Sequence, residues 1–439
     1  MTSLNTYALE SNTYFKLNFD GGDLSSDSGL LLIKEFTQKL GFTKLLKDEF
    51  QTTDTASSRT HKDDENLWQV IYQIYGAYFQ DDCADELTND PVLKAVLGKE
   101  ALASQPTLSR FFNRMDDATH LQFYEIMRQM RKIVYFIKQP PFILLDLDST
   151  LLLAHGKQEG REYNFHYRNH GYHPLVCFDG ITGDLIKIEL RDGAAHSSTG
   201  VIDFMEPILD EFNKDYPTIP LLLRGDSAFA TPKLYEQCET NGVSYVIRLR
   251  ENNRLHKLAQ EISDKLITAT KHNQIDYAVE YGEFLYQADS WDYPRRVVCK
   301  VEKPANQFIH LYTFIVTNMD SEPYQLIKLY SKRGAMENYV KEAKNGFDFA
   351  SVSSSTRIVN ANRLQLHALA YNIFNWFKRL VLPFKMRKQQ IDTLRLKLLK
   401  VASKVVRSAR YMTFKLCSHF PYKSEFYETL ENIRKLQLE

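Results

Sequence analysis

The chain has 439 residues, of which 44% are hydrophobic and 25% are charged, as is typical of a globular protein with two or three domains. Its 55 basic residues balance its 55 acidic residues, so net charge gives no support for binding to nucleic acid. No run of about 18 apolar residues is free of charges, and the start, Met1 to Phe15, has no signal-peptide pattern. We therefore expect a cytoplasmic protein without a membrane segment. The five cysteines are widely spaced and form no Cys-x-x-Cys pair, which argues against disulfides and a zinc site.

Residues 1–138 are predicted to be mainly helical after a short extended start. Phe15 to Phe19 alternates like a strand, whereas Leu67 to Phe79 has the apolar and aromatic content of a helix. Ser104 to Arg110 contains a Ser or Thr cap beside a proline and predicts a helix start, which could belong to a helix-turn-helix. An ordinary helical bundle is the interpretation that the sequence alone favours.

Residues 139–249 have a different pattern, in which short apolar runs alternate with helices. Strands are expected at Phe142 to Asp148, Leu175 to Phe178, Leu185 to Leu190, Ile219 to Leu223 and Val243 to Ile247, with helices at Val201 to Phe212 and after Pro232. This order predicts an α/β fold with a mixed sheet, the order of a ribonuclease-H-like domain. We interpret residues 250–320, with a charged helical stretch and three strand-like runs, as a β-rich insertion.

Helices resume after Pro323, so we assign residues 321–380 to the second part of the α/β domain and residues 381–439 to a basic helical C-terminal region. Lys378 to Arg410 contains about eleven Lys or Arg residues and one acid, with Leu and Val at helical spacing. Such a tract is either an amphipathic helix with a solvated basic face or a helix that follows DNA phosphates.

Two acids lie near the end of the first apolar strand. Side chains alternate along a strand, so Asp146 and Asp148 share one face. Buried carboxylates are costly unless they are paired or bound to a metal. For two acids on one face, a metal site and a structural role as a cap or as the partner of an arginine are about equally expected.

Asp226 ends a second apolar strand, in the sequence Arg224-Gly225-Asp226. Sites in open α/β sheets lie at the carboxyl ends of strands, so Asp226 and Asp148 can converge there. The two carboxylates would repel each other without a cation between them, and oxygen ligands suit Mg²⁺ or Mn²⁺.

A third acid, Glu337, lies in a predicted helix with Tyr330, Arg333 and Lys344. At 100° per residue, these four residues lie within about 60° of one another on one face. An acid flanked by two cations suits a metal ligand among phosphate contacts, although a solvated face with a salt bridge is the simpler interpretation of this segment alone. Gly334 weakens the helix, and a break there would disturb the shared face.

Together these segments resemble the DDE transposases of insertion sequences. Tyr330-x2-Arg333-x3-Glu337-x6-Lys344 matches the Tyr-Arg-Glu-Lys signature of one large superfamily, and the segments Asp148 to Thr150 and Arg224 to Phe229 are similar to its first and second acid motifs. The gap of about 110 residues between Asp226 and Glu337 resembles the β-rich insertion of this superfamily. Three further stretches resemble the insertion-sequence family numbered thirteen-eighty, within the insertion-sequence-four superfamily: Leu102 to Arg110, His155 to Gly160 and Glu239 to Ile247.

The resemblance implies DNA transposition by three catalytic carboxylates. Asp148, Asp226 and Glu337 would hold two Mg²⁺ or Mn²⁺ ions about 3.5–4 Å apart, which serve to hydrolyse a strand at the transposon end and to join its 3′-OH to target DNA. Residues expected to contact DNA are Tyr330, Arg333, Lys344 and Arg224. The role of Asp146 stays open, because Leu151 to Leu153 departs from the more acidic sequence of some members.

The partners implied by this resemblance are the terminal inverted repeats of the element, target DNA and a second copy of the chain, as a homodimer on DNA. The helical N-terminal region and the basic tract would contact DNA. Five histidines after the first acid fit no zinc template, and we interpret most of them as loop or DNA-proximal residues: His155, His166, His170, His173 and His196.

Two alternatives remain. In a haloacid-dehalogenase-like phosphatase, Asp146 would be the nucleophile and Asp148 the acid/base, but Asp226 then comes too early in the sequence and the segment around Glu337 stays unexplained. The other alternative is a transposase relic that binds DNA without cutting it. The presence of all three acids argues against such decay.

Overall fold

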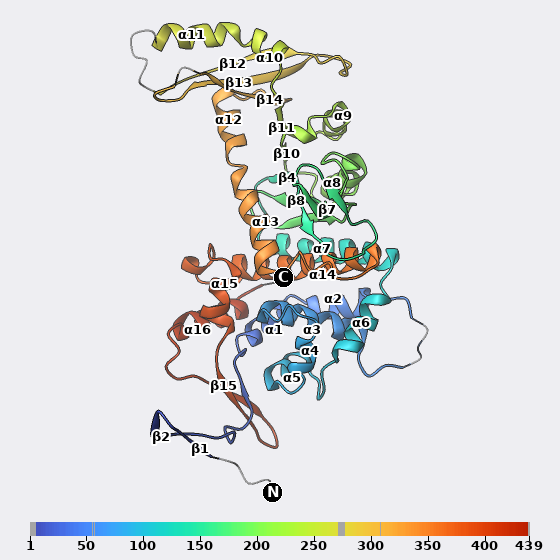
Figure 1. The fold of residues 1–439 in the computed structure, drawn as a ribbon, viewed down its shortest axis with the longest axis vertical. Coiled ribbons are helices and arrows are strands. Elements are labelled where there is room, and N and C mark those ends of the chain that lie inside the picture. Colours follow the sequence, from blue (N-terminus) through green and yellow to red (C-terminus); the bar gives the residue numbers. More distant parts are fainter. Residues whose placement is uncertain (1–5, 55, 57, 271–276, 308, 438–439) are drawn as a thin grey trace. The chain divides into compact units, whose positions relative to one another are not determined.

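The computed structural model describes residues 6–437 except 55, 57, 271–276 and 308 (Figure 1). The predicted polar start, Met1 to Phe15, therefore lies partly outside the described residues. The chain forms two compact units: the first contains Met1–Ile137, Lys344–Ser351 and Gln365–Glu439, and the second contains Lys138–Ala343 and Val352–Leu364. This grouping differs from the linear division expected from the sequence, because most of residues 344–380 joins the N-terminal and C-terminal segments. No described helix is both long enough and apolar enough to cross a membrane.

The first unit is mainly helical. Its helices are α1 (Leu30–Lys39), α2 (Phe42–Glu49), α3 (Asp63–Gly76), α4 (Cys83–Glu86), α5 (Pro91–Leu97), α6 (Gln105–Asn113), α7 (Asp117–Ile137), the C-terminal part of α14 (Arg357–Val381), α15 (Ile391–Leu394) and α16 (Lys423–Arg434). The predicted helix start at Ser104 is confirmed, since Ser104 precedes α6 and proline occupies its first turn. Buried aromatic rings join distant segments of the unit, as Phe36 of α1 packs edge-on against Phe377 of α14.

The basic tract does not form the single helix that we expected. Helix α14 ends at Val381, and short turns and α15 follow up to β15 (Ser403–Arg407). This strand pairs antiparallel with β16 (Met412–Leu416) and with β3 (Leu24–Ser25). Two local features explain the difference: Pro383 stops the helix, and Ser403 to Val405 alternates between buried and exposed side chains as a strand does.

The second unit contains a mixed sheet of eight strands in the order β12-β13-β14-β11-β10-β4-β8-β9. The strands predicted from residues 139–249 are confirmed as β4 (Ile143–Ser149), β8 (Leu175–Asp179), β9 (Leu185–Glu189), β10 (Leu221–Gly225) and β11 (Ser244–Leu249). Strand β10 lies parallel to β4 and to β11, whereas β8 pairs antiparallel with β4 and β9. A smaller sheet, in the order β5-β7-β6, is formed by the chain between β4 and β8.

The segment that interrupts this order in the sequence extends the same sheet in space. After α10 (Asn253–Leu258) and α11 (Gln260–Thr270) come the strands β12 (Ala278–Tyr286), β13 (Arg295–Lys303) and β14 (Leu311–Thr317). Strand β14 pairs antiparallel with β11 and with β13. The segment thus covers an edge of the central strands that would otherwise expose unpaired backbone groups.

Helices lie on both sides of the central strands (Figure 1). Helices α8 (Val201–Asp215) and α9 (Pro232–Thr240) lie on one side, and α12 (Pro323–Ser331) lies on the other. Leu326 and Ile327 of α12 pack on a buried cluster that includes Leu144 of β4 and Leu222 of β10. Helix α12 therefore covers the sheet face that carries the acids of β4.

The single helix expected from Tyr330 to Lys344 is broken. Helix α12 ends at Ser331, and α13 (Gly334–Gly346) begins after a turn at Lys332 and Arg333. The N–H of Arg333 donates to the carbonyl of Tyr330 at 2.9 Å, which closes this turn. The weakness that Gly334 introduces therefore coincides with a real helix end, and the four residues do not share one continuous helical face.

Candidate active site

Polar side chains follow the apolar core on the sheet face beneath α12. In the register of β10 and β4, Leu222 lies beside Leu144 and Arg224 lies beside Asp146. Because side chains on one face recur every two residues, Asp148 and Asp226 come next on that face, at the carboxyl ends of their strands. The sequence thus builds an apolar layer, then a buried ion pair, and then two acids at the edge of the sheet.

The first acid, Asp148, is paired with Arg333. A guanidinium nitrogen of Arg333 lies 2.9 Å from Asp148, with 14% and 21% of the two side chains exposed. The same guanidinium donates to the carbonyl of Leu147 at 3.3 Å. Burial raises the pKa of Asp148, the positive charge of Arg333 lowers it, and the negative charge of Asp226 raises it further. Asp148 and Asp226 are therefore close enough to repel each other.

Asp226 is held at the start of a short turn. Its carboxylate accepts a hydrogen bond from the N–H of Ala228 at 2.9 Å and caps the 3₁₀ turn Ser227–Phe229. Burial lowers the pKa of Arg333, but the charges of Asp148 and Asp226 oppose this and raise it overall. The guanidinium of Arg333 thus lies within electrostatic reach of both acids.

The two acids of β4 have different environments. Asp146 is completely buried, and its two oxygens accept hydrogen bonds from Nε and Nη2 of Arg224 at 2.5 and 2.6 Å. Arg224 is only 1% exposed, and its Nη1 donates to the carbonyl of Leu329 in α12 at 2.7 Å. Burial raises the pKa of Asp146, while its hydrogen bonds and charge attraction to Arg224 oppose that rise. This forked pair ties β4, β10 and α12 together.

This environment bears on two expectations from the sequence. Arg224 is 1% exposed and paired with Asp146, so the structure lends no support to its expected contact with DNA, which stays an untested prediction. Asp146 cannot serve as the exposed nucleophile of a phosphatase, which removes the observation that supported that alternative. In this structure Asp146 is the buried partner of an arginine, which favours a structural role over a metal site.

The other residues of the predicted signature occupy different positions. Tyr330 is half-buried against the core cluster beneath α12, and its pKa is raised mainly by burial and, more weakly, by the charge of Asp226. Glu337 is exposed in the first turn of α13. Lys344 lies in the last turn of α13 and belongs to the first unit.

Asp148 and Asp226 suit a divalent cation in their chemistry. Both offer carboxylate oxygens, which Mg²⁺ and Mn²⁺ prefer, and their mutual repulsion favours a cation beside them. Across the part of the chain that the structure describes, no three His, Cys, Asp or Glu side chains are close enough together to hold a metal. The structure therefore brings together Asp148, Asp226 and Arg333, and it does not bring Glu337 to them.

Sequence reasoning missed two residues beside this site. The hydroxyl of Tyr167 donates to the carbonyl of Ser149 at 3.3 Å, and the charges of Asp148 and Asp226 add to burial in raising the pKa of Tyr167. Arg248 of β11 is exposed and lies near enough to Tyr330 to lower its pKa. Arg248 could have been found from strand alternation, whereas Tyr167 comes from a loop whose path the sequence does not specify.

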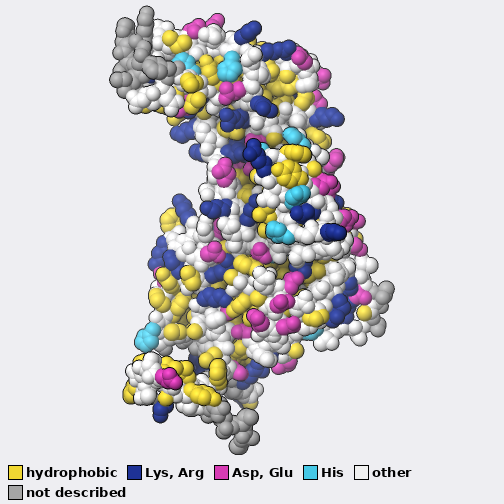
Figure 2. All heavy atoms as spheres, viewed as in Figure 1, with side chains coloured by type: hydrophobic (Ala, Val, Ile, Leu, Met, Phe, Trp, Pro, Cys, Tyr) yellow, Lys and Arg dark blue, Asp and Glu magenta, His cyan; other side chains and the backbone are white. Residues whose placement is uncertain are grey.

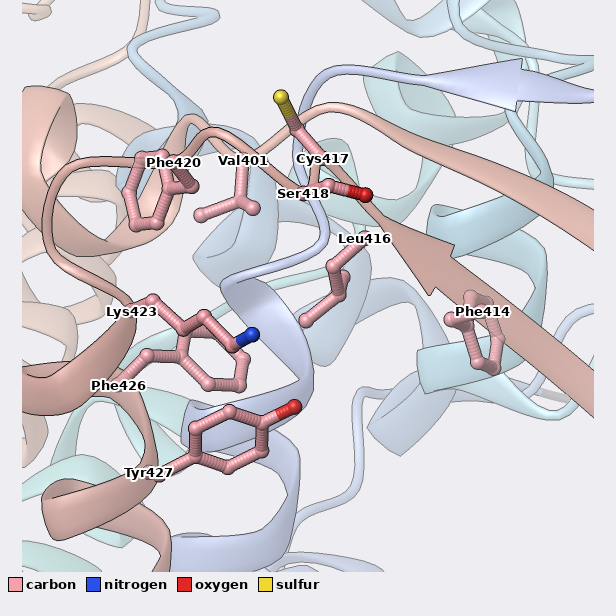
Figure 3. Close-up of a pocket in the computed structure, with 9 residues that line it drawn as sticks. All are labelled: Val401, Phe414, Leu416, Cys417, Ser418, Phe420, Lys423, Phe426 and Tyr427. Carbon is pink, nitrogen blue, oxygen red and sulfur yellow. The ribbon is translucent and has the colours of Figure 1, made fainter.

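A separate cavity lies in the first unit (Figure 3). It has a volume of about 180 Å³ and is lined by Val401, Phe414, Leu416, Cys417, Ser418, Phe420, Lys423, Phe426 and Tyr427. Its lining contains no acid and none of the residues predicted to carry the chemistry. We therefore assign it no part in the candidate site.

Comparisons with known proteins identify the family of the chain through its sequence. The sequence profile of the family described as Transposase DDE domain group 1 matches residues 8–438. No curated protein matches the chain in sequence. The solved structures similar to it include the piggyBac transposase synaptic complex with hairpin DNA, with 15% identity and a TM-score of 0.46 over 85% of this chain and 80% of that chain. They also include the Mos1 mariner paired end complex with Mn, with 10% identity and a TM-score of 0.19 over 77% and 84% of the two chains.

The family match extends over nearly the whole described chain, including both units and the strands that carry Asp148 and Asp226. The protein belongs to the Transposase DDE domain group 1 family and is a transposase of the DDE type.

Proposed function

We propose that this transposase cuts DNA at the ends of an insertion sequence and joins the exposed 3′-OH to target DNA. The catalytic residues in this proposal are Asp148, Asp226 and Glu337, carried by a ribonuclease-H-like domain. Two observations support it: the order β11-β10-β4-β8-β9 within the sheet, and the convergence of Asp148 and Asp226 at adjacent strand ends. The convergence of the two acids carries most weight, because neighbouring carboxylates repel each other and a bound cation relieves that repulsion.

Bound Mg²⁺ or Mn²⁺ would activate water or the 3′-OH and stabilise the leaving oxygen in an in-line displacement. Asp148 and Asp226 would hold such ions through their carboxylate oxygens, and Glu337 would complete the ligand set. Glu337 lies in the first turn of α13, four residues after Arg333 in the turn that precedes this helix. The turn at Lys332 and Arg333 offers a hinge about which a movement of α13 would bring Glu337 to the aspartates.

Arg333 would bind the phosphate beside the cut. Its Nε is buried and has no hydrogen-bond partner among the described residues. A phosphodiester oxygen would compete with Asp148 for the guanidinium of Arg333, whose side chain is 14% exposed. We further propose that Tyr330 and Lys344 contact DNA, that the protein acts as a homodimer on DNA, and that it belongs to the insertion-sequence family numbered thirteen-eighty.

The test is cleavage of DNA that carries the terminal repeats of the element, with and without Mg²⁺. We expect Asp148→Asn, Asp226→Asn and Glu337→Gln each to abolish cleavage and strand transfer while leaving DNA binding within about twofold. Asp210→Asn, which changes an exposed acid on α8, is the matched control and should cut like the wild type. Cleavage that survives Asp148→Asn or Asp226→Asn would refute the proposal, and a wild type that binds but never cuts would identify a relic.

A further inference from the structure

A small hairpin beside the candidate site exposes a cluster of aromatic rings. Strand β6 (Glu162–Asn164) is joined to β7 (Asn169–Tyr172) by residues 165–168, and β7 also pairs with β5 (Leu152–Leu153). Phe165 at the tip is 83% exposed, and Tyr163 and Tyr167 are 38% and 41% exposed. Exposed aromatic clusters of this kind mark interaction sites, because water contact with such large apolar surfaces is unfavourable.

The tip of the hairpin is held in place by a buried side chain. Oδ1 of Asn164 accepts hydrogen bonds from the N–H groups of His166 and Tyr167, both at 3.1 Å. Nδ2 of the same asparagine, which is 4% exposed, donates to the carbonyl of Gly193 at 2.8 Å. The aromatic residues therefore project from a preorganised turn, which lowers the entropic cost of binding a ligand.

The composition of the tip suits a nucleic-acid strand. The ring of Phe165 packs edge-on against Tyr163 at 5.2 Å, and Tyr163 packs against His170 at the same distance. From Tyr163 to His170 the sequence contains one arginine and two histidines and no acid. Aromatic faces with nearby basic side chains are the pattern that binds unpaired bases and their phosphates, and the exposed Glu162 lies at the opposite end of β6 from the tip.

The hairpin adjoins the two aspartates. The hydroxyl of Tyr167 donates a hydrogen bond to the carbonyl of Ser149, the residue after Asp148. Burial raises the pKa of Tyr167, and the negative charges of Asp148 and Asp226 also raise it. In Figure 2, hydrophobic and histidine side chains gather over the region of β7, near the middle of the view. A DNA strand whose phosphate reaches Asp148 would therefore pass the aromatic tip.

We propose that this hairpin binds an unpaired DNA base next to the phosphodiester that is cut, with Phe165 stacking on the base. The proposal rests on the proposed function, since a DNA strand must enter the site of Asp148 and Asp226. It adds a base-binding site to the carboxylate site and predicts a preference for frayed or single-stranded DNA. Stacking on an aromatic face tolerates any base, so recognition at this point should be nearly independent of sequence.

The test uses the full-length chain and a short single-stranded DNA oligonucleotide that contains 2-aminopurine, whose fluorescence is quenched by stacking. We expect the wild type and Phe165→Tyr to quench it, and Phe165→Leu to lose the quenching and to bind about 10-fold more weakly. Leucine keeps an apolar side chain and removes only the aromatic face. Phe136→Ala, which removes a phenylalanine of α7 that is 70% exposed, is the control and should behave like the wild type.

A fully paired duplex of the same sequence, measured in parallel, should show no dependence on residue 165. The inference is overturned if Phe165→Leu quenches and binds the single strand like the wild type, or if it weakens duplex binding equally. Cleavage by the wild type with Mg²⁺ is scored separately. If quenching depends on Phe165 but the protein never cuts DNA, the proposed function is refuted and the base-binding site is still supported.

Discussion

Two acids that lie two residues apart on one strand have separate roles because of what faces them. Asp146 is enclosed by Arg224, whereas Asp148 is partly exposed beside Arg333 and Asp226. The sequence predicts both acids on one face of a strand. It leaves two possible partners for each acid, an arginine or a metal ion. The sequence alone cannot say which partner each acid has. Arg224 lies 78 residues from Asp146 in the chain and comes beside it through the register of β10 and β4.

The Asp146–Arg224 pair should matter mainly for stability. Asp146→Ala leaves a buried guanidinium without its carboxylate, so we expect it to lower the free energy of unfolding by about 3–5 kcal/mol. Urea unfolding followed by circular dichroism measures this change. The double replacement Asp146→Leu with Arg224→Met should recover part of the loss, because it removes both charges. A single variant as stable as the wild type would contradict the structural role.

Asp179, at the end of β8, predicts a pH dependence of stability. Burial raises its pKa to about 6, its hydrogen bond from Thr182 opposes the rise, and the charge of Asp184 adds to it. The folded protein thus holds this proton more tightly than the unfolded chain, so its contribution to stability is lost as the pH rises from about 4 to about 6. The loss corresponds to about 3 kcal/mol.

Asp179→Asn should remove this dependence, because the amide does not ionise and can still accept the hydrogen bond from the N–H of Ile181. Unfolding free energies at pH 4 and pH 7 measure the effect. We expect the variant to be more stable than the wild type at pH 7 and to lose less stability between the two values. An unchanged pH dependence would show that another group is responsible.

At the scale of elements, the positions of strands in the sequence can be predicted more easily than their pairing into a sheet. Short apolar runs gave β4, β8, β9, β10 and β11 in the right places, since alternation and turn residues act locally. The joining of β14 to β11 depends on contacts between distant segments, and it makes one sheet of two predicted parts. The predictions of one helix in the basic tract and of one helix around Gly334 were wrong for local reasons. A proline ends the helix in the basic tract, and a turn divides the helix before Gly334.

The hairpin of β6 and β7 depends on a glycine that tolerates no side chain. A Cβ at Gly171 would lie 2.0 Å from the carbonyl oxygen of Leu152 in the neighbouring strand. We therefore expect Gly171→Ala to separate β5 from β7 and to speed hydrogen exchange in residues 152–172. Gly334→Ala is the matched control, because nothing lies within 4 Å of its Cβ position and alanine favours a helix. Equal exchange in both variants would argue against the close packing of this hairpin.

At the scale of the whole molecule, the proposed function requires a chain with zero net charge to bind DNA through local clusters. We expect the logarithm of the binding constant to fall by about 0.9 per phosphate contact for each tenfold rise in salt. Replacing three exposed basic residues of the C-terminal region, Lys404, Arg407 and Arg410, by glutamine should reduce this slope by about three. Titrations of labelled duplex at several salt concentrations measure it, and an unchanged slope would exclude this surface from DNA binding.

The site itself combines parts that sequence can and cannot predict. The pattern of apolar runs places Asp148 and Asp226 at strand ends, whereas the adjacency of β4 and β10 comes from pairing between distant segments. The position of Glu337 depends on the turn between α12 and α13, and propensity alone did not specify that turn. The family match spans the positions of all three acids. Whether these acids bind metal ions together can be measured on this chain.

Manganese binding to the protein–DNA complex, followed by electron paramagnetic resonance, tests this joint action most directly. We expect two ions per chain in the wild type, a loss of both in Asp148→Asn and Asp226→Asn, and a loss of one in Glu337→Gln. If the three variants take up manganese as the wild type does, these carboxylates are not the ligands and the account fails.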